Sequence, residues 1–206
     1  MEDFEQHWEN IFQHKSDKQK SWYESYPTLS IAFIERLQLP KDAAIIDVGG
    51  GDSRLVDALL EKGYSNITVL DISATAIENT KRRLDQNAQK INWIVGDILE
   101  FHSDLKFDLW HDRAAFHFLI AEDKIKKYVQ LCETNTTPGG YLIVGTFSEK
   151  GPEKCSGLDV RRYSEASMSL RFEGKFERIK CVEENHITPF KTRQSFLFCS
   201  FKKMKN

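Results

Sequence analysis

The residues best suited to chemistry lie in the segment Asp47-Val48-Gly49-Gly50-Gly51, which closes a short apolar run and precedes an expected helix. Glycine has no Cβ atom, so a ligand can approach the backbone closely at these positions. The first N–H groups of a helix have no partner inside the helix and attract a carboxylate or a phosphate. This segment therefore predicts a binding site for a small ligand.

A dinucleotide site is the nearest alternative for such a loop. Its fingerprint is G-x-G-x-x-G, and here Arg54 occupies the position of the third glycine, so the fingerprint fails. Asp47, placed just before the glycines, also argues against a pyrophosphate. An acid in this position favours a cofactor that carries an amino group.

Two further acids follow the next two expected strands. Asp71 ends the second strand, where a carboxylate can accept hydrogen bonds from both hydroxyls of a ribose. Asp97 follows the third strand in Gly96-Asp97-Ile98, where an acid beside an apolar residue suits an adenine amino group and its ring. Each acid alone is equally typical of a helix cap. Three acids after three successive strands indicate a nucleoside-containing cofactor.

The strands and helices that would position these acids alternate along the chain. Short apolar runs predict buried parallel strands over residues 43–48, 67–70, 91–95, 107–111 and 141–146. A helix with an apolar face begins near Leu55 and ends at Gly63, and Ser73 is expected to cap a second one. Residues 125–132 show the spacing of a third helix, which Pro138-Gly139-Gly140 is expected to break. The pattern predicts an α/β fold with a mostly parallel sheet.

The two ends of the chain depart from this alternation. Residues 1–40 are rich in aromatic side chains and predict two helices, the second starting at Tyr26-Pro27-Thr28. Residues 176–183 and 195–201 predict two strands with no helix between them, which implies an antiparallel pair. The last strand carries Phe196, Leu197, Phe198 and Cys199 in succession, so we expect it inside the sheet.

The composition narrows the class of protein. With 206 residues the chain suits one α/β domain over residues 1–206, and its net charge of −2 gives no basic surplus for nucleic acid. The acidic N-terminus predicts no signal peptide, and no apolar run is long enough to cross a membrane. The four cysteines have no paired spacing, and Cys132, Cys181 and Cys199 are predicted to be core residues, which indicates a reducing compartment. We therefore expect a cytoplasmic protein.

The segments already described resemble the class I S-adenosylmethionine-dependent methyltransferases. The matching stretches are Ala44–Gly51, Val69–Ser73, Val95–Ile98 and Pro138-Gly139-Gly140. More narrowly, the chain resembles a group of small bacterial methyltransferases through His7-Trp8-Glu9, Ser21-Trp22-Tyr23 and Trp110-His111-Asp112-Arg113-Ala114. The family fold implies a Rossmann-like sheet of seven strands with helices on both faces, in which the last strand is antiparallel and lies beside the fifth.

The resemblance also implies a cofactor, S-adenosylmethionine, with S-adenosylhomocysteine as product. Asp47, Gly49 and Gly51 would surround its methionine part, whereas the position of Gly50 varies in the family. Asp71 with the following Ile72 would lie at the ribose, and Asp97 with Ile98 at the adenine. Trp22 and Tyr23, in an N-terminal helical lid formed by residues 1–40, either close over the cofactor or belong to the N-terminal core.

Candidate residues for the methyl acceptor follow the fourth strand, because ligands of open parallel sheets bind beyond the carboxyl ends of the strands. His111, Asp112 and Arg113 are the candidate catalytic residues. His111 is either a general base or a strand-end residue bonded to backbone. Asp112 and Arg113 either act on the acceptor or pair with each other. His117, between two phenylalanines, is more typical of a core histidine.

The loops that follow offer weaker candidates. The Cys155 thiol is expected to be passive, Arg161 and Arg162 either bind an acidic substrate or face solvent, and His186 carries the least signal. The histidines and cysteines lack the spacing of zinc ligands, so no metal site is predicted.

The sequence thus leaves several functions open. A methyltransferase acting on O, N or S of a small molecule leads. A protein lysine methyltransferase is the main alternative, followed by a catalytically silent cofactor-binding module and, more distantly, a nicotinamide-dependent oxidoreductase. Asp-Arg-Ala-Ala after the fourth strand differs from the Asn/Asp-Pro-Pro-Tyr of enzymes that methylate adenine or glutamine. No motif in the sequence identifies the methyl acceptor or the oligomeric state.

Overall fold

The computed structural model describes residues 2–205, and the backbone forms two compact units. The first extends to Phe101 and includes residues 188–192, and the second contains residues 102–187 and the chain from Arg193 onward. Seven strands follow the order β3-β2-β1-β4-β5-β9-β8 along the sheet, and a separate two-stranded sheet pairs β6 with β7. This confirms the predicted seven-stranded α/β fold.

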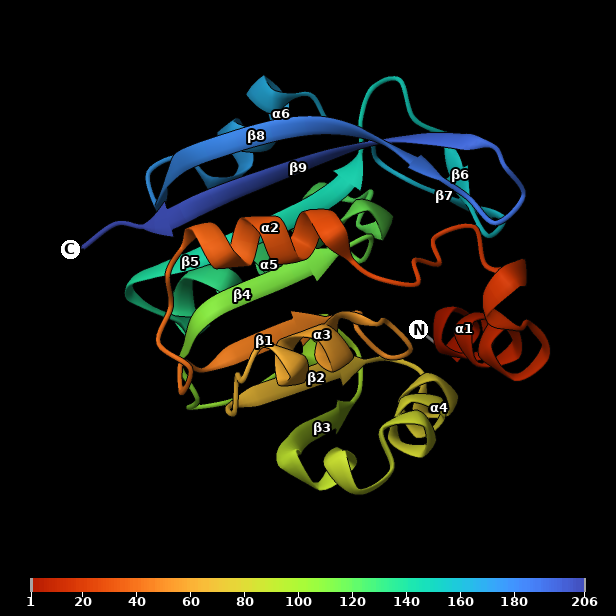
Figure 1. The fold of residues 1–206 in the computed structure, drawn as a ribbon. Helices are drawn as coiled ribbons and strands as arrows, with labels where there is room; N and C mark the ends of the chain where they lie inside the picture. Colours follow the sequence, from red (N-terminus) through yellow and green to blue (C-terminus); the bar gives the residue numbers. More distant parts are fainter. Residues whose placement is uncertain (1, 206) are drawn as a thin grey trace. The chain divides into compact units, whose positions relative to one another are not determined.

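The first unit alternates strands and helices, as the sequence predicts (Figure 1). Its three parallel strands are β1 Ile45–Val48, β2 Ile67–Asp71 and β3 Ile91–Val95. Its α-helices are α1 Glu2–His14, α2 Thr28–Arg36, α3 Leu55–Glu61 and α4 Ala74–Leu84. Three short 3-10 helices are η1 Asp17–Gln19, η2 Asp85–Lys90 and η3 Ile98–Glu100.

Local sequence signals fix the helix ends in this unit. The Ser73 hydroxyl accepts a hydrogen bond from the Ala76 N–H at 3.1 Å, so the predicted cap of α4 is confirmed. Gly63 adopts a φ of +84°, a left-handed conformation in which glycine readily ends a helix, and it follows α3 as expected. Every residue of β1 and β2 is buried, as expected of parallel strands covered on both faces.

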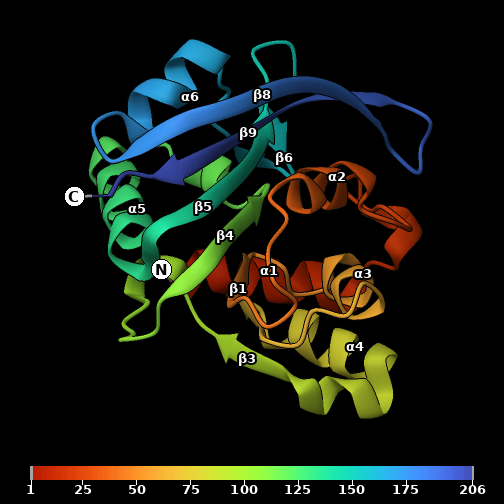
Figure 2. The ribbon, with the colours of Figure 1, turned by 60° about the vertical axis from the view of Figure 1, so that its left-hand side comes forward.

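The second unit contains the remaining strands (Figure 2). They are β4 Phe107–Arg113, β5 Thr136–Phe147, β6 Lys154–Cys155, β7 Leu158–Asp159, β8 Phe176–Ile187 and β9 Arg193–Lys203. Its helices are η4 Phe116–Phe118, α5 Glu122–Asn135 and α6 Glu165–Phe172. The helices α5 and α6 pack on β5, β8 and β9 (Figure 2). The predicted antiparallel pair is confirmed, and β9 lies between β5 and β8 as expected.

The start of β5 differs from the prediction. The strand begins at Thr136 and therefore includes Pro138-Gly139-Gly140, which we expected to lie before it. Thr136 pairs with Phe107 and the next pair is Leu109 with Tyr141, so the intervening residues form an irregularity in the ladder. Gly139 has a φ of +78°, which suits such an irregularity. The prediction that this segment ends the helix is wrong, because α5 ends at Asn135 and the strand begins before Pro138.

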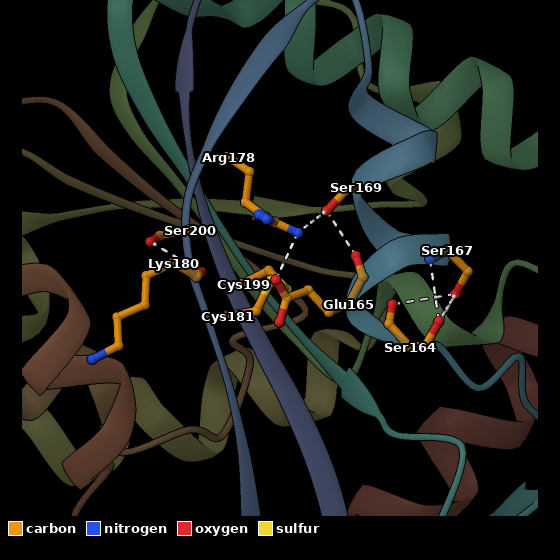
Figure 3. The surroundings of a disulfide bond; sticks show 9 residues. All are labelled: Ser164, Glu165, Ser167, Ser169, Arg178, Lys180, Cys181, Cys199 and Ser200. Carbon is orange, nitrogen blue, oxygen red and sulfur yellow. Dashed lines mark hydrogen bonds and ion pairs between the residues drawn. A yellow bond between two sulfur atoms is a disulfide. The ribbon is translucent and has the colours of Figure 1, made fainter.

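Two cysteines form a disulfide, contrary to our expectation that they are unlinked core residues. Cys181 and Cys199 are directly opposite each other in the β8–β9 ladder, with Cα atoms 4.1 Å apart (Figure 3). Spacing along the chain could not reveal this pair, because it depends on the register of the two strands. Nearby, Arg178 of β8 pairs with Glu165 of α6 at 2.6 Å (Figure 3). Cys132 and Cys155 are free and buried.

Candidate functional site

The glycine segment forms a tight turn between β1 and α3. Gly49 has a φ of +68° and donates its N–H to the carbonyl of Leu70 at 2.8 Å. Gly51 donates its N–H to Oδ2 of Asp71 at 2.9 Å. The turn is therefore fastened to the end of β2, and the acid at that strand end helps to shape the loop.

The loop has no room for larger residues at two of its glycines. A Cβ atom on Gly50 would lie 2.2 Å from Oδ2 of Asp47. A Cβ atom on Gly51 would lie 2.6 Å from both the Cβ of Ala76 and Oδ2 of Asp71. In this chain a side chain at Gly50 would require the buried Asp47 carboxylate to move, and Gly50 stays a candidate cofactor-binding residue together with Gly49 and Gly51.

Asp71 is buried at the end of β2, and both of its oxygens accept backbone hydrogen bonds. Oδ1 accepts the N–H of Ser73 at 2.8 Å, and Oδ2 accepts the N–H of Gly51. Burial nevertheless raises the pKa of Asp71 to about 7, and the nearby acids Asp52 and Asp47 add to the effect. Each carboxylate oxygen has a second lone pair, so the group can still accept two hydroxyls.

The third acid is at the end of β3. Oδ1 of Asp97 accepts the N–H of Leu99 at 2.8 Å and so caps η3. Asp97, Ile98 and Ile72 are all half-buried. The helix-cap interpretation of Asp97 thus holds, and its second oxygen and the two isoleucines remain candidates for the adenine and ribose contacts.

The two aromatic residues of the N-terminal segment have different surroundings. Trp22 packs edge-on against Trp8 and Phe12, with ring centroids 5.7 and 6.2 Å away, so it belongs to the N-terminal aromatic core. Tyr23 lies under the guanidinium of Arg54, 6.0 Å from its ring centroid, and Arg54 immediately precedes α3. Tyr23 is therefore the better candidate for a residue beside the cofactor.

In the second unit, alternation along β4 separates the three candidate catalytic residues, because successive side chains of a strand point to opposite faces. Trp110 and Asp112 contact Tyr128 of α5: the Tyr128 hydroxyl donates to Oδ2 of Asp112 at 2.5 Å and accepts from Nε1 of Trp110 at 3.1 Å. His111 and Arg113 belong to the other face. Tyr128 is thus the hydrogen-bond partner of Asp112 on its face of the strand, while burial raises the pKa of Asp112 and electrostatic interaction with His111 opposes that rise.

Asp112 also holds the turn that follows β4. Its Oδ1 accepts the N–H groups of Ala115 and Phe116 at 3.0 and 3.1 Å. Burial raises the pKa of Asp112 to about 6, although the hydrogen bond from Tyr128 and those from the backbone oppose the rise. Ala114, the residue between Arg113 and Ala115, adopts a φ of +70°, a conformation that costs a non-glycine residue free energy. The carboxylate thus stabilises a strained turn directly after Arg113.

Arg113 and His117 occupy one neighbourhood. The Arg113 guanidinium lies over the ring of Phe196 at 4.9 Å. His117 is fully buried, and its Nδ1 accepts the N–H of Phe147 at 3.4 Å. Burial, followed by the charge of Arg113, lowers the pKa of His117 to about 3, so it is neutral at physiological pH. This fits a core histidine. His186 is buried and packs edge-on against Phe196.

The remaining candidates are engaged elsewhere. Arg161 pairs with Glu122 at 2.6 Å and Arg162 with Glu153 at 2.8 Å, which fits solvated ion pairs more than a substrate site. Cys155 is buried. Across residues 2–205, histidine, cysteine and acidic side chains form no group that could hold a metal ion. Over the same range no helix has both the length and the apolar character of a membrane span.

Sequence reasoning missed the role of two residues near these sites. Lys20, which looks like an ordinary surface residue, is buried and pairs with Asp17 and with Asp52. Tyr128 was predicted only as part of an apolar helix face, yet its hydroxyl bridges Trp110 and Asp112. Only tertiary contacts reveal these pairs.

Comparison with known proteins agrees with the geometry. Residues 45–140 match the family model of a methyltransferase domain. The chain is 31% identical over 121 residues to EEF1A lysine methyltransferase 2 of Danio rerio, a match covering 55% of this chain and 52% of the relative. It is 26% identical over 191 residues to malonyl-[acyl-carrier protein] O-methyltransferase 1 of Ilyobacter polytropus, covering 85% and 70%. The chain thus spans about half the length of the first of these relatives.

A solved structure shows the same fold. The 1,6-didemethyltoxoflavin-N1-methyltransferase of Burkholderia thailandensis, solved with bound 1,6-didemethyltoxoflavin and S-adenosylhomocysteine, superimposes with a TM-score of 0.71. The match covers 95% of this chain and 82% of that one, at 16% identity. Residues 45–140 are therefore similar to a methyltransferase domain, and the chain has the fold of the class I S-adenosylmethionine-dependent methyltransferases.

Proposed function

We propose that this protein is an enzyme that transfers a methyl group from S-adenosylmethionine to an O, N or S atom of a small molecule, with S-adenosylhomocysteine as product. One observation supports this most: the glycine turn after β1 is fastened by the Gly51 N–H to the buried carboxylate of Asp71, so the turn and the acid at the end of β2 lie side by side. The sulfonium of the cofactor supplies an already activated methyl group. The protein then needs mainly to align the acceptor.

The residues of the first unit fit this cofactor. The buried carboxylate of Asp47 suits an ammonium group, and Asp71 suits a ribose diol. Ile72, Asp97 and Ile98 suit the adenosine. These assignments stay proposals, and each can be tested by the loss of cofactor affinity in a single variant.

In the second unit we assign different roles to the three candidate residues. His111 and Arg113 are proposed to contact the acceptor, with Phe196 orienting the Arg113 guanidinium. Asp112 is proposed as a positioning residue, because both of its oxygens are already bonded to Tyr128 and to the turn after β4. The motif Trp110–Ala114 further supports membership of the small bacterial group that carries it.

A small-molecule acceptor is supported by the similar structure solved with bound 1,6-didemethyltoxoflavin. An O-methylation is supported by the malonyl-[acyl-carrier protein] O-methyltransferase that matches 85% of this chain. A protein lysine acceptor is the alternative, supported by the lysine methyltransferases that match over a shorter part of the chain. A cytoplasmic location remains our prediction from the sequence.

The first test is calorimetric titration of the purified protein with S-adenosylmethionine and, separately, with NADH. Binding of the first alone supports the proposal, and binding of NADH would refute it. A screen of hydroxyl, amine, thiol and peptide acceptors with radiolabelled cofactor would then identify the acceptor class. With an acceptor in hand, His111→Ala and Asp112→Ala should lower turnover more than cofactor affinity. Normal turnover in both variants would move the chemistry to other residues.

A further inference from the structure

Lys20 is a charged residue in a buried position of the first unit. Its side chain is only 3% exposed, and its Nζ atom pairs with Oδ1 of Asp17 at 3.0 Å and with Asp52. Asp52 immediately follows the three glycines of the loop. A residue of the N-terminal segment therefore brings a positive charge to the loop proposed to hold the cofactor.

The other cations near this loop have different partners. Arg83 donates to the carbonyl of Ser53 at 2.6 Å and to Asp57 at 2.7 Å. Arg54 donates to Oδ2 of Asp17 at 3.0 Å, and its side chain is 28% exposed. A planar guanidinium in such pairs has its direction fixed, whereas an ammonium has three N–H groups that rotate freely. Asp17 and Asp52 accept two of the three on Lys20, and the Nζ atom also lies 5.5 Å from the centroid of the Phe12 ring, a contact that leaves the third N–H without a hydrogen-bond acceptor in the part of the chain that the structure describes.

The cofactor sets the chemical requirement. The methionine end of S-adenosylmethionine carries both an ammonium and a carboxylate. Asp47, Asp52 and Asp71 make the surroundings of the loop acidic, and burial raises the pKa of Asp52 even though Lys20 lowers it. A carboxylate brought into such a place needs a cation within hydrogen-bond distance.

We propose that the third N–H of Lys20 binds the carboxylate of the cofactor, while Asp17 and Asp52 hold the ammonium in position. This inference rests on the proposed function and deepens it, because it assigns recognition of the amino-acid end to a residue outside the family motifs. The N-terminal segment then contributes directly to cofactor selection, through its one buried lysine among the described residues.

The test compares two ligands, S-adenosylhomocysteine and its decarboxylated analogue, by calorimetry. The wild type is expected to prefer the intact ligand by about ten- to a hundredfold, the range of a hydrogen bond between charged groups. Lys20→Met should bring this preference close to one, and Lys20→Arg should keep part of it. Lys18→Met is the matched control, since Lys18 is exposed two residues earlier, and its preference should equal that of the wild type.

The preference ratio separates recognition from folding. Lys20→Met leaves Asp52 without its buried cation and is expected to lower stability, so the double variant Lys20→Met, Asp52→Asn serves as a second, charge-balanced measurement. A wild type that binds both ligands equally would overturn the inference without any variant, and so would an undiminished preference in the folded Lys20 variants. In either case the proposed function stands. Binding of neither ligand to the wild type would instead overturn the proposed function itself.

Discussion

Cofactor affinity should depend on pH through Asp71. Burial raises the pKa of this carboxyl to about 7 in the free protein, so near pH 6 most molecules carry it protonated. A ribose diol donates two hydrogen bonds, and the ionised carboxylate is the form that accepts both. Affinity must therefore rise with pH, because the cofactor selects the ionised form.

The size of the effect follows from the fraction that is ionised. With a pKa of about 7, roughly 9% of the carboxyl is ionised at pH 6 and roughly 90% at pH 8, so the apparent Kd should fall about tenfold between them. Binding should also release about 0.9 proton per cofactor at pH 6 and about 0.1 at pH 8.

Calorimetry at pH 6, 7 and 8, each in two buffers with different ionisation enthalpies, measures both quantities. Asp71→Asn is the control: it cannot titrate, and it lacks one acceptor, so its affinity should be lower and should lose the tenfold dependence. Asp71→Ala should weaken binding strongly as well. The reasoning is refuted if the wild type and Asp71→Asn show the same change of affinity with pH, or if the affinity of Asp71→Ala is unchanged.

Three further changes test individual contacts. Gly51→Ala would place a Cβ atom 2.6 Å from that of Ala76, and we expect a loss of about 1–3 kcal/mol in urea unfolding together with weaker cofactor binding. A variant with normal stability and affinity would show that the loop relaxes freely. Tyr128→Phe removes the hydrogen bond to Asp112 and should cost about 1–3 kcal/mol in the same assay; a loss near zero would mean that water replaces the hydroxyl. Cys181→Ser opens a link between residues 18 apart and should cost about 3 kcal/mol, matched by dithiothreitol treatment of the wild type and contradicted if reduction leaves the unfolding midpoint unchanged.

Much of the fold could be predicted because its signals are local. The Ser73 cap, the stop at Gly63 and the apolar runs of β1 and β2 each lie within a few residues of the element they define. The short hairpin of β6 and β7 and the helix α6 were not predicted. Two strands of two residues each show no alternation, and α6 has only eight residues.

Some residues of the candidate site could likewise be predicted from local signals, and others could not. The glycine loop and Asp71 could be found because strand ends mark the ligand edge of a parallel sheet. The Lys20–Asp52 pair joins residues 32 apart, and the Tyr128–Asp112 pair joins residues 16 apart. Neither spacing has a meaning until the elements are packed. The positioning role that we propose for Asp112 therefore rests on the structure, in which its carboxylate accepts hydrogen bonds from Ala115, Phe116 and Tyr128.

The alternation along β4 has a consequence for how the chain could acquire a new substrate. Trp110 and Asp112 are hydrogen-bonded to Tyr128, whereas the Arg113 guanidinium lies over the ring of Phe196. Substitutions at 111 and 113 can therefore alter the shape and charge offered to an acceptor while the supporting bonds persist. A library randomised at these two positions should yield mostly folded proteins, and one randomised at 110 and 112 should not. Alternate positions of β4 are thus expected to differ in their tolerance to substitution, with positions 111 and 113 more tolerant than positions 110 and 112.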